Sequence, residues 1–133
     1  MPTVVVEVAR SPEDCWRAFT NARLFAAWMP GLRRVTVVSA HDDGLPREVL
    51  FELSTSLTYT LTYSYDLAKR EVRWEPRINA RDGVRGYVVL EPSERGTRMT
   101  YKLEQGAGRT MGDLVIGGSH AIVEAFVRWV ERT

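Results

Sequence analysis

Cysteine and histidine are scarce in this sequence. Its 133 residues include one cysteine, Cys15, and two histidines, His41 and His120. A single cysteine excludes both an intramolecular disulfide and a metal site built from several cysteine ligands. We therefore expect no metal site and no cofactor.

Net charge and long apolar runs are also lacking. Eighteen basic and seventeen acidic side chains leave a formal net charge of +1, whereas nucleic-acid-binding domains usually carry a basic excess. No stretch approaches the roughly 18 consecutive apolar residues of a membrane span, and the N-terminus lacks the basic and apolar segments of a secretory signal. We expect a cytoplasmic protein with no nucleic-acid partner and no integral membrane segment.

The composition that remains is that of an ordinary globular domain. Hydrophobic residues make up 44% of the chain and charged residues 26%, which are typical values for such domains. A chain of this length buries roughly two-thirds of its unfolded surface. Because no repeat, low-complexity tract or linker interrupts the sequence, we expect one domain over residues 1–133.

The first thirty residues predict a strand and two short helices. Thr3–Ala9 is rich in β-branched residues and predicts a strand. Ser11 followed by Pro12 and two acidic residues is a helix start, and this helix should end near Asn21. A second short helix follows and is stopped at Pro30.

Beyond residue 32 the apolar residues recur with a period of two. This alternation predicts six further strands, and their hairpin-length connections predict an antiparallel sheet with one covered face. The predicted strands cover residues 33–40, 47–54, 56–67, 71–76, 86–92 and 96–104.

From about Met111 to Arg132 the period returns to that of a helix. Val115, Ile122, Phe126 and Trp129 share one apolar stripe. Two adjacent glycines at 117 and 118 allow two interpretations. Either the helix includes them and approaches a ligand or the sheet closely, or it begins at Ser119 as its N-cap.

Three segments resemble a known superfamily. Val8–Asn21 combines a strand end, Pro-Glu and an apolar residue beside Trp. Trp28–Val35 contains an aromatic-x-Pro segment. Glu91–Tyr101 has the pattern of a hairpin that contains Gly-Thr-x-apolar-Thr-Tyr. With the C-terminal amphipathic helix, this order resembles the START-like (SRPBCC) superfamily of birch-pollen-allergen-like helix-grip proteins. The resemblance is to its polyketide cyclase/dehydrase-type or lipid-transport branch.

The resemblance implies an α+β helix-grip fold. In such a fold a curved antiparallel sheet of about seven strands wraps around a long C-terminal helix, with two short helices between the first two strands. A ligand cavity between sheet and helix is also implied. The glycine pair of the Hsp90-activator branch and the iron-binding patterns of related oxygenases are absent from the sequence.

The stretch "SLTYTLTYSYDL" (Ser56–Leu67) places large residues at every odd position, including Tyr59, Tyr63 and Tyr65. Burying a tyrosine hydroxyl without a partner costs about 1–3 kcal/mol, so a dry core would favour Val, Ile or Leu. The pattern therefore favours a cavity with an aromatic wall and a few polar groups. The alternative is a half-buried sheet whose tyrosines reach solvent at its rim.

The predicted ligand-binding residues combine this wall with residues of the helices. They are Trp28, Phe51, Tyr59, Leu61, Tyr63, Tyr65, Trp74, Met99, Tyr101, Val115, Ser119 and Ile122.

No catalytic set is identified. Cys15 lies on an apolar helix stripe, which predicts a buried structural thiol. His41 lies in a polar turn and His120 opposite the apolar stripe of its helix, so both are predicted to be exposed.

Three functions remain open. The first is binding of a hydrophobic small molecule, a lipid or polyketide-like compound, in the cavity. The second is a polyketide cyclase or dehydratase that uses the same cavity, since holding a reactive conformer needs no sequence motif. The third is a protein-partner module, which an exposed Trp28 would favour.

Overall fold

A curved antiparallel sheet forms most of the structure. The computed structural model describes residues 3–54, 56, 58–76, 85–104 and 119–132. Within these residues seven strands form one sheet in the order β1-β7-β6-β5-β4-β3-β2, with antiparallel pairs throughout. The strands are β1 (Thr3–Val8), β2 (Leu32–Ala40), β3 (Pro46–Leu53), β4 (Thr58–Asp66), β5 (Glu71–Pro76), β6 (Arg85–Ser93) and β7 (Gly96–Glu104).

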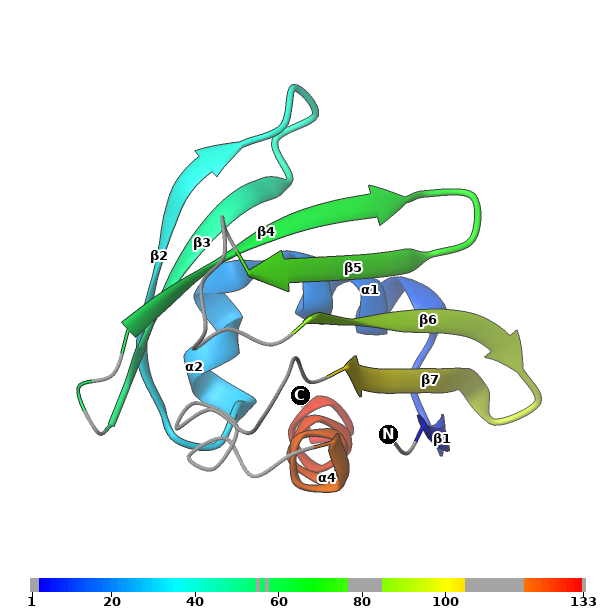
Figure 1. Cartoon of the computed structure of the whole chain (residues 1–133). Helices are drawn as coiled ribbons and strands as arrows, with labels where there is room; N and C mark the ends of the chain where they lie inside the picture. The colour runs from blue at the N-terminus through cyan, green and yellow to red at the C-terminus, as the bar shows by residue number, and fades with distance from the viewer. Residues whose placement is uncertain (1–2, 55, 57, 77–84, 105–118, 133) are drawn as a thin grey trace.

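The helices lie on the concave side of this sheet (Figure 1). They are α1 (Pro12–Thr20), the 3-10 turn η1 (Ala22–Leu24), α2 (Phe25–Trp28) and α4 (Ser119–Val130). Two short helices thus separate β1 from β2, and a C-terminal helix packs against the sheet, so the predicted α+β helix-grip fold is confirmed. Each helix of the described ranges is too short or too polar to span a bilayer.

The start of α1 follows the predicted capping pattern. Ser11 has extended backbone angles, and its hydroxyl accepts a hydrogen bond from the Asp14 amide at 3.2 Å. Pro12 occupies the first helical position, where its missing N–H would have no partner. Asn21 ends α1 and then accepts a hydrogen bond from the Arg23 amide at 3.2 Å, which begins η1.

Most strand bounds differ from the prediction by at most one residue, and the strand predicted over residues 56–67 differs by more. The strand predicted over residues 56–67 ends at Asp66, where the Asp66 carboxylate accepts a hydrogen bond from the Lys69 amide at 3.2 Å and the chain turns. Leu67 consequently lies in the turn and is 62% exposed. The predicted helix start near Met111 lies outside the described residues, and α4 is described from Ser119.

A contact between the two ends of the chain fixes the end of α4. The Arg10 side chain donates from Nε to the Val130 carbonyl at 3.0 Å and from Nη2 to the Glu131 carbonyl at 2.9 Å. The Glu131 carboxylate accepts a hydrogen bond from the Ala9 amide at 2.8 Å. A cation at this place satisfies terminal carbonyls and complements the helix dipole, so the contact holds α4 beside β1.

Close packing inside the sheet depends on Gly86 of β6. Gly86 lies directly opposite Trp74 of β5, and the Trp74 indole covers it. A Cβ atom at this position would lie 2.3 Å from the Lys102 carbonyl oxygen and 3.0 Å from the Trp74 ring. The missing side chain therefore allows the indole to lie flat on the inner face, which is the face turned toward the helices.

Candidate ligand-binding site

The inner face of the sheet carries an aromatic wall. Phe51 of β3 pairs with Tyr59 of β4, and their rings stack with centroids 5.2 Å apart. Tyr63 pairs with Trp74 of β5 at 6.0 Å, and Trp74 lies 5.5 Å from Tyr101 of β7. The structure thus brings together these five predicted residues, and each is at most 6% exposed.

Leu61 and Met99 belong to the same inner face. They are 3% and 0% exposed, and they alternate with the tyrosines along β4 and β7. Apolar side chains therefore surround the aromatic rings on the sheet.

Helical side chains face this wall. Trp28 of α2 lies 5.0 Å from Phe126 of α4 and 5.3 Å from Phe19 of α1, measured between ring centroids. Phe25 links the two sides, because its ring lies 6.1 Å from Phe51 and 6.2 Å from Tyr63. The predicted list omitted the three phenylalanines, although Phe19 and Phe126 lie on helical stripes that the sequence displays.

Two further predicted residues of the C-terminal segment can be compared with the structure. Ile122 of α4 is 3% exposed and belongs to the buried core. Ser119 is described only as the first residue of α4, without its side chain. Val115 and the glycines at 117 and 118 lie outside the described residues.

Polar groups converge inside this apolar interior. The phenol groups of Tyr59, Tyr63 and Tyr101 come from two strands, and besides burial their proximity raises the pKa of Tyr63 and Tyr101. Burial is the larger cause, and it raises the pKa of Tyr63 and Tyr101 well above the ordinary tyrosine value. These hydroxyls therefore remain protonated at physiological pH and act as neutral hydrogen-bonding groups.

The Trp28 indole adds a donor without a partner. Its Nε1–H is buried, and no described residue accepts a hydrogen bond from it. Trp28 as a whole is 5% exposed. A buried indole N–H usually has a partner, so this donor marks a place where an acceptor is expected. The exposed Trp28 that would favour a protein-partner module is not observed.

Tyr65 differs from the other tyrosines of β4. It is half-buried, and its hydroxyl donates to the Pro46 carbonyl at 2.7 Å. Its ring packs against Trp16 at 6.1 Å and against His41 at 5.7 Å. The Tyr65 hydroxyl is thus already engaged, and this residue is less buried than Tyr59 and Tyr63.

The histidines and the cysteine have structural environments. The prediction of an exposed His41 is wrong: the ring is half-buried, and its Nε2 lies 2.8 Å from the Tyr63 carbonyl oxygen. His120 is exposed as predicted. Cys15 is fully buried, and burial raises the pKa of its thiol, so it is the inert thiol that the sequence predicted. Among the described residues, no three metal-binding side chains gather in one place.

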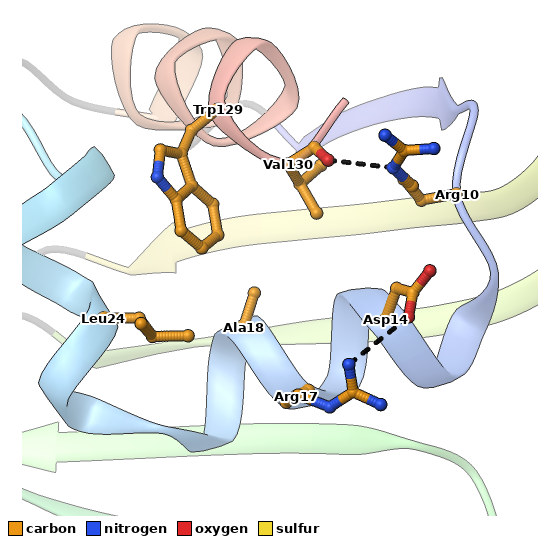
Figure 2. Close-up of a pocket in the computed structure, with 7 residues that line it drawn as sticks. All are labelled: Arg10, Asp14, Arg17, Ala18, Leu24, Trp129 and Val130. Carbon is orange, nitrogen blue, oxygen red and sulfur yellow. Dashed lines mark hydrogen bonds and ion pairs between the residues drawn. The ribbon is translucent and has the colours of Figure 1, made fainter. Parts of the chain in front are cut away.

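A separate surface pocket of about 290 Å³ opens between α1 and the end of α4 (Figure 2). Leu24, Ala18 and Trp129 form its apolar part, and the Arg17–Asp14 ion pair, 3.6 Å long, lies at one side. Arg10 closes another side but is already bonded to the end of α4. None of the predicted ligand-binding residues lines this pocket.

Solved structures share the fold over nearly the whole chain. A START superfamily protein from Mycobacterium smegmatis superposes with a TM-score of 0.76 at 14% identity, covering 98% of this chain and 97% of that chain. A STAR-related lipid transfer protein from Xanthomonas axonopodis gives a TM-score of 0.70 at 18% identity, covering 98% and 85%. An aromatase/cyclase from a Streptomyces species gives 0.67 at 15% identity, covering 98% and 92%.

At these low sequence identities the structural matches establish a common fold, and the family is assigned from the sequence. No curated protein sequence matches this chain significantly. The family described as "Polyketide cyclase / dehydrase and lipid transport" matches residues 2–132. The matched residues include the three motifs and the C-terminal helix on which the resemblance was based. The chain therefore belongs to this family of START-like proteins.

Proposed function

We propose that this protein binds one hydrophobic small molecule, a lipid or polyketide-like compound, between the inner face of the sheet and α4. The observation that carries the proposal is the buried group of hydrogen-bonding side chains within an aromatic interior. Three phenols and the Trp28 indole lie among apolar rings. Mostly apolar walls with a few polar groups are typical of small-molecule sites.

The energetics support a guest rather than a dry core. A buried polar group without a partner costs about 1–3 kcal/mol. A guest with a carbonyl or hydroxyl oxygen would accept a hydrogen bond from the Trp28 indole, and its apolar surface would contact the rings. Each apolar square ångström removed from water contributes about 25 cal/mol.

Binding is favoured over catalysis by the chemistry of the interior. The buried polar or charged side chains of the described residues, apart from the tyrosines and tryptophans, are Thr20 and Thr97. Thr97 is engaged, because its hydroxyl donates to the Arg10 carbonyl at 2.7 Å. General acid–base catalysis needs a group that changes protonation near neutral pH, and phenols with raised pKa values do not.

A cyclase function is the second candidate, because the family includes such enzymes. Neutral phenols could donate hydrogen bonds to ketone oxygens and hold a flexible chain in a reactive conformer. Incubation with poly-β-ketone analogues, followed by mass spectrometry, distinguishes the two functions: a cyclised product supports the enzyme, and unchanged compound supports a carrier.

A fluorescence titration with Nile red tests the binding proposal. Wild type should bind about one dye per chain, and Tyr63→Trp should weaken binding about tenfold or more because the larger ring occupies guest space. Tyr87→Trp is the matched control, because Tyr87 lies on the outer face beneath Arg73, 4.9 Å from the guanidinium carbon. Equal binding by wild type and a folded Tyr63→Trp variant would contradict the proposal.

A further inference from the structure

The edge strand β2 has features of a pairing surface. It ends the sheet, so within the described ranges its backbone pairs with β3 alone. Val37 and Val38 in its second half are 41% and 52% exposed, although Val37 lies on the inner face opposite the fully buried Val49. An edge strand with exposed apolar residues is a template for another strand.

The charges along this edge would be complementary between two copies of β2 that run antiparallel. Exposed Arg33 and Arg34 lie at the start of β2, and exposed Asp42 and Asp43 lie in the turn just after its end. An antiparallel copy of the same strand would place each basic end near the acidic turn of the other copy. Parallel pairing would instead bring like charges together, at an energetic cost.

Arg34 is also largely neutralised within its own chain. Its Nε and Nη2 donate to the two oxygens of the Glu52 carboxylate at 2.7 and 3.0 Å. The β2 edge is therefore less protected by charge repulsion than its two consecutive arginines indicate.

The opposite edge of the sheet lacks this pattern. On β1, Val5 is 56% exposed, but the strand has six residues and its one acidic residue, Glu7, already pairs with Arg98 at 3.2 Å. The end of α4 also lies beside this edge, held by Arg10. Val5 is therefore a suitable control for Val38, because it is an exposed valine on an edge strand without complementary charges.

We propose that two copies of this chain pair antiparallel through β2 and form a dimer with a sheet that continues from one copy to the other. The valines meet at the centre of the interface, and the Arg33 side chain of each copy lies near the Asp42–Asp43 turn of the other. The inference is independent of any small-molecule guest.

The dimer should be weak. The pairing of β2 with β3 is irregular at Arg33 and again between Val37 and Ala40, and such bulges shorten the stretch that can form a regular ladder. An interface of one short strand pair lies at the small end of the range for specific complexes. We therefore expect dissociation in the micromolar range, about 10–100 µM.

Sedimentation velocity between about 1 and 300 µM tests this inference. Wild type should shift from monomer to dimer, and Val38→Lys should weaken the dimer about tenfold or more because it places a cation in an apolar centre. Val5→Lys should leave the dimer unchanged. A wild type that remains monomeric, or a dimer lost with Val5→Lys and kept with Val38→Lys, overturns the proposal.

A charge exchange gives a second test that does not depend on the valines. Arg33→Glu and Asp42→Arg should each weaken the dimer severalfold through new like-charge contacts. The double variant should recover wild-type association, because opposite charges face each other again. Additive weakening in the double variant overturns the proposed antiparallel pairing.

Discussion

Replacing Arg10 by glutamine should loosen the C-terminal end of α4. The guanidinium donates two hydrogen bonds to carbonyls at the end of the helix. One goes to Val130 at 3.0 Å (Figure 2), and the other goes to Glu131 at 2.9 Å. Glutamine is shorter and uncharged, so it loses both contacts and the interaction with the helix dipole.

The magnitude follows from these contacts. A hydrogen bond from a charged donor contributes about 1.5–3 kcal/mol, and a cation at a helix C-terminus about 0.3–1 kcal/mol. Because the bond to Glu131 is exposed, solvent reduces its share, and we expect a total loss of about 2 kcal/mol in the free energy of unfolding. For a chain of this size that loss lowers Tm by about 5–10 °C.

Urea unfolding and amide hydrogen exchange together provide the assay. Arg10→Gln should lower the unfolding midpoint and speed exchange in the last turn of α4, and Arg10→Lys should lose less because the charge remains. Arg17→Gln is the control: Arg17 is 72% exposed and makes only a 3.6 Å ion pair with Asp14, so its loss should stay within about 0.5 kcal/mol. Equal stability of Arg10→Gln and Arg17→Gln would refute the reasoning.

Two further predictions follow from the sheet. Gly86→Ala should cost about 1–3 kcal/mol and shift Trp fluorescence, since its Cβ would lie 2.3 Å from the Lys102 oxygen. Unchanged stability and unchanged Trp emission in the Gly86→Ala variant would exclude the steric explanation. Burial raises the folded-state pKa of Tyr63 and Tyr101 above the reference 10.0. The unfolded state therefore loses protons first, so stability should hold below pH 10 and fall above it. Absorbance at 295 nm in a pH titration would contradict this if all phenols ionised together near pH 10 in the folded protein.

The fold was predictable because its signals are local. Ser11 and Pro12 mark the start of α1, and the alternation along β4 places Tyr59 and Tyr63 on the buried face. These patterns depend on backbone periodicity and capping, which neighbouring residues determine. The family resemblance supplied the order of the elements and the position of the C-terminal helix.

The details that escaped prediction depend on contacts between distant segments. His41 lies in a polar turn, but in the folded chain its ring contacts the Tyr63 carbonyl, 22 residues away in sequence. Arg10 reaches Val130 across 120 residues. Phe19 and Trp28 meet around Phe126 only after three helices pack together. The spacing of residues along the chain does not indicate such long-range contacts.

Fluorine NMR of protein labelled with 3-fluorotyrosine locates a bound guest relative to the tyrosines. The five tyrosines give one resonance each, which single Tyr→Phe variants assign. Binding at the inner face predicts that, on addition of Nile red, the resonances of Tyr59, Tyr63 and Tyr101 shift while that of Tyr87 stays in place. A dye that binds but shifts Tyr87 and leaves the three inner tyrosines unchanged would contradict it.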